Sequence, residues 1–474
     1  MKTKATNAAR EKTPKGRAPA VSLATATSVV VANMIGIGVF TSLGYQVDPA
    51  RGIPSAFAIM ALWFVGGVVA LCGALSYAEL AAALPRSGGE YHFLSRIFHP
   101  LLGFLAGWTS ATVGFAAPIA LAAMVFGEYL KAALPPHALD FIATLGIAPE
   151  KFPLALSLLV VWLNSIIHFA GIRRGSAFQD LFTALKVALI LAFLICGFFV
   201  KNHEPVTFLP RAQDWKMVGS GAFAVSLVYV MYAYSGWNAS TYIVSEIRNP
   251  QRNVPRSVFL GTLVVLVLYV ALNAVFLFTT PMREMAEAAA QDKPNVASLA
   301  GVHIFGEAGG RVMNALICIG LISTISSMTW IGPRVTVAMG EDFPALRWLS
   351  IKTKNGIPRV ALAVQLLITN ALLFTSTFAQ VTNYITPALT FFSFLTVLGV
   401  IALRRWQPDL PRPYKTWGYP WTPIIFLAVS AWMLFHATRS QPKETAAALV
   451  TLLAGAVVYF ASAKAGSRKS ARSF

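Results

Sequence analysis

Gly36 and Gly38 stand two residues apart in the middle of the first long apolar stretch of the sequence. Glycine leaves the helical conformation easily, so this spacing predicts a break between two half-helices. The first N–H groups of the second half-helix would then be free to bind an anion such as a carboxylate. Close helix packing through small residues is the alternative explanation. Ile35, Gly36, Ile37 and Gly38 are therefore candidate ligand-binding residues.

A second apolar stretch, residues 232–240, carries glycine, serine and asparagine at its centre and aromatic residues on either side. An asparagine in apolar surroundings needs a hydrogen-bond partner inside the protein. A polar packing seam would also satisfy it. If the stretch is a second break, it adds five candidate ligand-binding residues, which are Tyr232, Tyr234, Ser235, Gly236 and Asn238.

Lys186 lies within a further apolar stretch, about 13 Å along the expected helix. Its side chain either extends to the membrane surface or faces the protein interior, where charged groups are usually functional. In the interior its partners would be backbone carbonyls freed by the first break. Alternative partners are three serines that share one face of another apolar helix, Ser323, Ser326 and Ser327. Together with Lys186 they are candidate gating or coupling residues.

These residues must be positioned by membrane-spanning helices. The chain is 56% hydrophobic and 12% charged, whereas a soluble domain carries about 25% charged residues. Its apolar stretches are long enough to cross a bilayer, which takes about 20 residues. We predict an all-α polytopic membrane protein whose twelve spans cover 22–45, 55–83, 101–130, 153–171, 178–200, 218–246, 256–280, 311–338, 358–379, 381–403, 421–438 and 444–463.

The positive charge of the chain marks its orientation in the membrane. A net charge of +19 would also suit nucleic acid, but the cations fall between and beyond the apolar stretches. Both tails and the loops on their side hold 26 of the 38 lysines and arginines, and the opposite loops hold 11. This imbalance predicts a multi-pass protein of the inner, cytoplasmic membrane with both termini in the cytoplasm. The expected partner is thus the lipid bilayer and not nucleic acid.

The two breaks divide the chain into related halves. Interrupted helices at corresponding positions of two halves are typical of inverted-repeat transporters. We expect five helices in each repeat, a retained first span rather than a cleaved signal, and two extra helices at the C-terminus. The predicted units are a disordered basic tail over 1–20, a transport core over 21–403 with repeats at 21–200 and 218–403, helices 11 and 12 over 404–463, and a basic tail over 464–474.

Cysteine and histidine give little support for catalysis or metal binding. Cys72, Cys196 and Cys318 all lie inside apolar stretches, and the seven histidines are scattered. An enzyme needs a convergent set of a nucleophile, a base or a metal. We therefore expect no enzyme activity, no metal and no cofactor.

Several short motifs occur in a characteristic order along residues 22–440. They are the break at Gly36 and Gly38, then 85–91 (PRSGGEY), 182–186 (FTALK), 234–238 (YSGWN), 249–255 (NPQRNVP) and 408–413 (PDLPRP). In this order and spacing they resemble the amino acid–polyamine–organocation superfamily, and within it the L-type amino acid transporter branch.

The resemblance implies a binding mode for an amino acid substrate. The break in segment 1 would bind the carboxylate through N–H groups, and carbonyls of segment 6 would bind the amino group. An aromatic residue at the Tyr232 position would act as a gate. Lys186 would replace a sodium ion between helices 1 and 8, which makes transport sodium-independent. Ile37 departs from the small polar residue of many members.

Specificity and partners follow from two further positions of the resemblance. Relatives that accept cationic amino acids can carry an acid where Ser235 stands, so neutral L-amino acids are expected here. The animal transporters bind a heavy chain through an extracellular cysteine. The loop after segment 3 has no cysteine, so no disulfide-linked heavy chain is expected.

Alternatives remain open at this point. The transporter could be an exchanger or a proton-coupled symporter, depending on whether Lys186 loses its proton during the cycle. An amine, polyamine or ethanolamine permease is a second hypothesis, although we expect no carboxylate at the midplane of segments 1, 3, 6, 8 or 10 to bind a polyamine. A non-transporting membrane sensor is a third.

Overall fold

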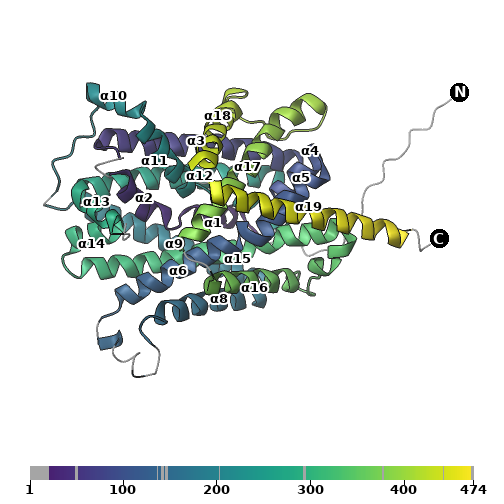
Figure 1. The fold of residues 1–474 in the computed structure, drawn as a ribbon, viewed down its shortest axis with the longest axis horizontal. Coiled ribbons are helices and arrows are strands. Elements are labelled where there is room, and N and C mark those ends of the chain that lie inside the picture. Colours follow the sequence, from purple (N-terminus) through teal and green to yellow (C-terminus); the bar gives the residue numbers. More distant parts are fainter. Residues whose placement is uncertain are drawn as a thin grey trace.

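The computed structural model describes residues 21–47, 52–135, 137–139, 144, 148–201, 203–291, 295–375, 378–440 and 442–470. Over these residues the chain consists of helices, their connections and one isolated bridge between Val21 and Ile247 (Figure 1). The predicted tail at 1–20 lies outside the described residues, as do residues 471–474. The first part of the tail predicted over 464–474 continues the last helix, α19 (Pro442–Ser470).

Eight helical segments of the described chain are long and apolar enough to cross a membrane. They are α1 (Leu23–Met34) with α2 (Gly38–Gln46), α3 (Ala56–Ala83), α5 (Pro100–Thr109) with η1 (Ser110–Gly114) and α6 (Ala116–Ala133), α8 (Phe152–Ala170), α9 (Ile172–Phe198), α12 (Pro250–Thr279), α15 (Gly309–Asp342) and the second part of α17 (Phe378–Trp406).

The other helices complete the pattern. The bent pair α10 (Ala212–Val218) and α11 (Gly221–Ala233) makes a ninth span if it is counted as one. Shorter apolar helices are α14 (Val296–Phe305), α16 (Arg359–Thr375), α18 (Trp421–Ser440) and α19. The remaining elements are α4 (Glu90–Ile97), η2 (Ala239–Glu246), α13 (Met282–Ala290) and η3 (Pro344–Ser350).

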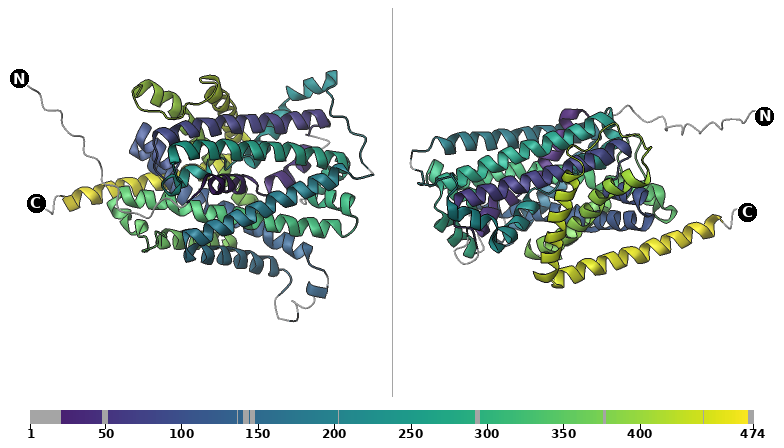
Figure 2. Two further views of the ribbon diagram at one scale, coloured as in Figure 1. Left: turned by 180° about the vertical axis from the view of Figure 1, so that it is seen from behind. Right: turned by 90° about the horizontal axis from the view of Figure 1, so that it is seen from above.

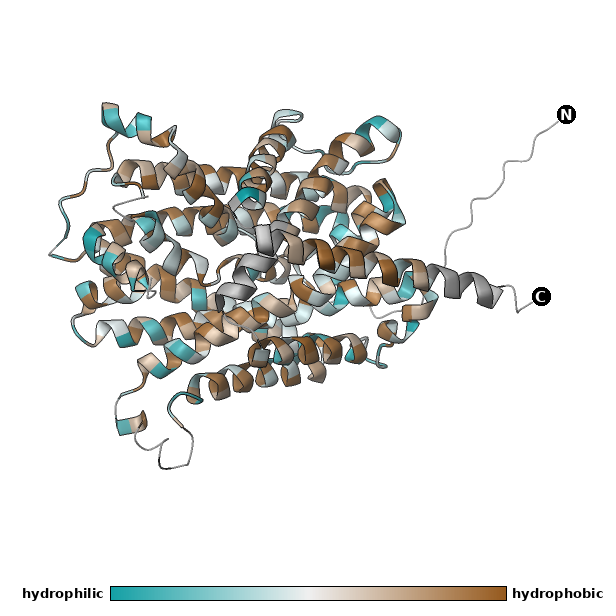
Figure 3. Cartoon of the chain, in the orientation of Figure 1, coloured by the Kyte–Doolittle hydropathy of each residue, from teal (hydrophilic) through white to brown (hydrophobic). Residues whose placement is uncertain are grey.

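The prediction of an all-α polytopic membrane protein is confirmed. Apolar residues cover the helices along their length, and hydrophilic residues gather at the connections between them (Figure 3). All twelve predicted spans overlap helices of the structure, although only eight or nine pass by length and composition. The number twelve therefore stays a prediction.

Most of the long helices lie along roughly one axis (Figure 2). Their contacts define two packed groups. In the first group α1, α3 and α12 pack together, with α11 against α3. In the second group α6, α8, α15 and α16 pack against one another. The first group thus holds predicted segments 1, 2, 6 and 7, and the second holds 3, 4, 8 and 9. Each group therefore contains helices from both predicted repeats, and the five-plus-five repeat itself stays a prediction.

Glu79 joins α3 to α17 and to the connection that follows it. Its carboxylate is 1% exposed and accepts two hydrogen bonds from Arg404, at 2.8 and 2.6 Å. It also accepts a third from the backbone N–H of Thr416, at 2.7 Å. Because a buried carboxylate without partners is costly, these donors fix α17 against α3.

We expect Arg404→Ala to destabilise the folded protein by about 3 kcal/mol, because the Glu79 charge would stay buried without its bidentate partner. Arg405→Ala is the matched control, since this neighbouring side chain is exposed. Thermal unfolding of both purified variants measures the difference. Equal unfolding temperatures would show that the ion pair does not hold α17 in place.

Candidate functional site

The structure contains the predicted break in the first span. α1 ends at Met34, and α2 begins at Gly38 after three residues that belong to neither helix. At Ile35 the backbone leaves the helical region, with ψ at 86°. The carbonyl of Met34 accepts a hydrogen bond from the Tyr269 hydroxyl at 2.7 Å. The unwound turn is thus held by side chains of other helices, as membrane-buried backbone requires.

A second break follows α11, where the helix ends at Ala233 and residues 234–238 form turns before η2. Gly236 has φ of +96°, a conformation that L side chains rarely adopt. A Cβ at Gly236 would also lie 2.5 Å from Asn33 Nδ2, which donates to the Gly236 carbonyl at 3.1 Å. On the other side of this contact, a Cβ at Gly38 would lie 2.9 Å from Ala233 Cβ. The two breaks therefore touch, and glycine is what permits the approach.

A cavity of about 150 Å³ lies between the two breaks and the second helix group. Most of the predicted ligand-binding residues line it, namely Gly36, Ile37, Gly38, Tyr232, Ser235, Gly236 and Asn238. The opposite wall includes Ser110, Gly114 and Phe115, at the π-helical turn η1 between α5 and α6. Such turns are frequent at functional sites. Sequence reasoning missed this wall because a π-turn has no distinctive composition.

Two predicted ligand-binding residues do not line this cavity with their side chains. Tyr234 is fully buried, packs on Tyr269 and donates its hydroxyl to the Trp63 carbonyl at 3.0 Å. Its assignment is corrected, because the turn after α11 directs this ring into the first helix group. Ile35 lines a separate apolar cavity of about 20 Å³ on the other side of the break. What Ile35 contributes near the break is its carbonyl oxygen.

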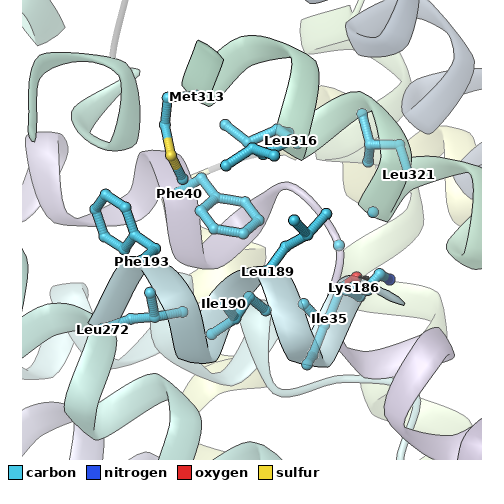
Figure 4. A pocket seen from close by; sticks show the side chains of 13 residues that line it. Ile35, Phe40, Lys186, Leu189, Ile190, Phe193, Leu272, Met313, Leu316 and Leu321 are labelled. Atoms are coloured by element: carbon cyan, nitrogen blue, oxygen red, sulfur yellow. Dashed lines mark hydrogen bonds between the residues drawn. The ribbon is translucent and has the colours of Figure 1, made fainter. Parts of the chain in front are cut away.

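Lys186 stands at the edge of this smaller cavity (Figure 4). Its side chain is 2% exposed, so it does not extend to the membrane surface. The ammonium donates to the Ile35 carbonyl at 2.6 Å, to Thr324 Oγ1 at 2.8 Å and to the Ala32 carbonyl at 3.4 Å. An ammonium has three donors, and all three have an acceptor here. Lys186 thereby joins α9, the unwound part of α1 and α15.

The three serines of α15 do not contact Lys186, and this expectation is corrected. Ser326 pairs with His168 Nε2 at 2.9 Å, and Ser327 donates to the Val29 carbonyl at 3.1 Å. Ser323 Oγ has no hydrogen-bond partner among the described residues. The helix face that meets Lys186 is the adjacent one, which carries Gly320 and Thr324. Sequence spacing defined a common face for the serines but not its direction.

Glu90 also lines the larger cavity, although it belongs to α4 and not to the five segments in which no midplane carboxylate was expected. It opens α4 between two spans and is 2% exposed. Its Oε1 accepts hydrogen bonds from Tyr77, from Ser393 at 3.0 Å and from Asn238 at 3.4 Å. Burial raises the pKa of the Glu90 carboxyl to about 6, although these three donors lower it. Glu90 belongs to the motif at 85–91, but that motif lies between two predicted spans. The sequence therefore did not indicate that Glu90 would reach the cavity.

An ion pair lies at the C-terminal end of η2. Arg334 on α15 donates to Glu246 at 2.8 Å, and the Trp330 indole donates to the same carboxylate at 3.1 Å. The backbone N–H of Val21, just before α1, donates to the Glu246 carbonyl at 3.0 Å. These contacts join the two helix groups at this end of the molecule.

Comparison with known proteins agrees with this architecture. Residues 21–460 match the family model of the amino acid permeases. The "large neutral amino acids transporter small subunit 2" of Mus musculus is 28% identical over 454 residues, which cover 93% of this chain and 80% of that protein. The "b(0,+)-type amino acid transporter 1" of Rattus norvegicus is 27% identical, with 93% and 87% covered. The "Asc-type amino acid transporter 1" of Mus musculus is 25% identical, with 93% and 80% covered. The resemblance to the amino acid–polyamine–organocation superfamily is therefore confirmed, and the chain belongs to the amino acid permease family.

Proposed function

We propose that this permease carries neutral L-amino acids across the cell membrane by sodium-independent secondary transport. The observation that supports this most is the contact of two broken helices around one cavity. The N-terminus of α2 presents N–H donors at Ile37 and Gly38, whereas the Gly36 N–H is bonded to the Met34 carbonyl, and the turn after α11 presents carbonyl groups. Donors on one wall and acceptors on the other suit the carboxylate and ammonium of one amino acid.

The rest of the cavity favours a neutral side chain. Its apolar surface comes from Phe115, Pro118, Leu121 and Met328. At the position where an acidic residue would suit a substrate with a basic side chain, this protein has the exposed Ser235. Among the described lining residues Glu90 is the one carboxylate, and it already has three donors. A polyamine carries several cationic centres and would need more than one such group, so this alternative is less well supported.

Lys186 supports the proposal of sodium independence. A fixed ammonium already satisfies the Ile35 carbonyl and Thr324 between α1 and α15. A sodium ion bound at this place would meet a like charge, which is unfavourable in a buried site. In the proposed cycle Lys186 stabilises the unwound part of α1 without an external cation.

Alternating access would move the first helix group against the second around the cavity. Such a movement must separate Arg334 from Glu246, which join the groups at one end. We propose that this end faces the cytoplasm, as the charge distribution of the loops indicates, and that both termini lie on that side. The cysteines Cys72, Cys196 and Cys318 lie within helices, which supports activity without a disulfide-linked heavy chain.

The direct test is counterflow in liposomes that contain the purified protein and unlabelled leucine. We expect uptake of labelled leucine, competition by other neutral amino acids, and equal rates in sodium and choline buffers. Ethanolamine and putrescine should not compete, because neither has a carboxylate for the α2 donors. The absence of counterflow with any amino acid would favour a sensor, and a requirement for sodium would contradict the role of Lys186.

Gly36→Ala should weaken leucine binding about tenfold or more, the cost of losing a hydrogen bond to a charged group. A Cβ at Gly36 meets nothing within 4 Å, so the variant should fold, with a methyl group added to the open space next in sequence to the donors of Ile37 and Gly38. Gly221→Ala is the matched control, because its Cβ also meets open space and Gly221 does not line the cavity. Equal leucine affinities of the two variants would refute carboxylate binding at the break.

Lys186→Met should reduce leucine counterflow about tenfold or more, because the Ile35 carbonyl and Thr324 would lose a buried donor. Lys201→Met is the matched control, since Lys201 is exposed just beyond α9. Thermal unfolding shows whether either variant remains folded. Full counterflow by a folded Lys186→Met protein would contradict the proposed role of the ammonium.

A further inference from the structure

Glu90 is a buried carboxyl group of the cavity that the binding of an amino acid, as proposed above, leaves without a task. It lines the cavity beside Asn238, two residues beyond Gly236 in the second break. All three donors to its carboxylate are neutral groups, on α3, in the turn before η2, and on α17. A buried carboxylate usually has a cationic partner, and the salt bridges of the described residues do not include Glu90.

Among the side chains that contact one another around Glu90, Glu90 is the one able to exchange a proton near neutral pH. α3 presents Tyr77, and η2 presents Tyr242, which lies next to Asn238. Both are phenols, which ionise only at about pH 10 or above. α17 presents Ser393, and α5 has no ionisable residue within its bounds.

The charged groups near α4 face other residues. Asp342 of α15 accepts hydrogen bonds from Tyr91 and Arg86, and Arg86 also pairs with Glu341. His92 lies among these charges, and burial lowers the pKa of its imidazole to about 4. Neither these groups nor Arg96, in the last turn of α4, form a salt bridge with Glu90 among the described residues, so no cation neutralises its charge there.

We propose that Glu90 is the proton-binding residue of the cavity and makes this permease a proton-coupled symporter. The inference rests on the proposed amino acid transport and adds the identity of the coupling group. In the step, the carboxylate takes one proton from water on the side to which the cavity is open. It becomes a neutral carboxylic acid that can be buried together with the substrate, and it returns the proton to water on the opposite side.

The three hydrogen-bond donors to Glu90 suit both its ionised and its protonated form. Three donors converge on Oε1 and stabilise the ionised form when water is present. The other oxygen can carry the added proton, so the same contacts survive when the group is neutral. Protonation therefore removes a buried charge without breaking the links from α4 to α3, α17 and the second break.

The test measures the steady-state ratio of internal to external leucine in proteoliposomes with the membrane potential clamped at zero. With one proton per leucine, a gradient of one pH unit, acidic outside, should support about tenfold accumulation by the wild type. Glu90→Gln, which keeps the shape but cannot exchange a proton, should bring the ratio to about one. Glu90→Asp should retain accumulation, and Glu307→Gln, the same change at an exposed position, should behave as wild type.

The ratio does not depend on the rate of transport, so a slow variant remains informative. Wild-type transport without accumulation, or equal accumulation by Glu90→Gln, would overturn the proposal while leaving amino acid transport intact. Absence of any wild-type uptake would instead refute the proposed function itself. Lysine competition with leucine that Glu90→Gln abolishes would also overturn it, because the carboxylate would then recognise a basic side chain.

Leucine binding to the purified protein decides the matter if Glu90→Gln does not transport. Because binding linkage is reciprocal, the wild-type affinity for leucine should rise as pH falls from about 8 to about 6, approaching tenfold per unit. The Gln variant should bind with an affinity that does not change over this range. A flat wild-type profile, or the same slope in both proteins, would exclude Glu90 as the proton site.

Discussion

The structure depends on the direct contact between two unwound segments in the middle of the membrane-spanning region. Unwound backbone in a bilayer must have its polar groups satisfied by protein or water. Here Asn33, in the last turn of α1, donates to the Gly236 carbonyl of the second break, and Tyr269 donates to the carbonyls of Met34 and Ala233, where α1 and α11 end. Each break is therefore stabilised partly by the other, and the cavity lies where they meet.

Lys186 completes this arrangement from the other side of α1. Its ammonium and the Thr324 hydroxyl both bind the Ile35 carbonyl, at 2.6 and 2.9 Å. The first break thus has the second break on one side and a cation on the other. This explains why an apolar stretch can lose its helical bonds and remain defined. It also separates the roles of Lys186 and Glu90, since one stabilises backbone and the other lines the cavity.

The sequence allowed the helical class and the two breaks to be predicted, because glycine spacing and apolar length are local properties. It also indicated that Lys186 would meet carbonyls of the first break. It did not reveal the partner on α15, since Thr324 and the serines lie on adjacent faces whose direction depends on helix packing. Glu90 escaped notice for a similar reason, because only the folded chain brings the loop after α3 against the second break. Tyr234 was misassigned because the direction of a turn cannot be read from composition.

The π-helical turn η1 has a consequence for the shape of the cavity wall. The N–H of Phe115 bonds to the Ser110 carbonyl, five residues back, so the span holds one residue more than a regular α-helix would. The wide turn takes up this extra residue locally, so deleting one residue there would restore regular winding without turning α6 about its axis. The cavity wall at Ser110, Gly114 and Phe115 would then lose its wide turn. A one-codon deletion or insertion at this turn could therefore remodel the site without altering any of the residues on the two breaks.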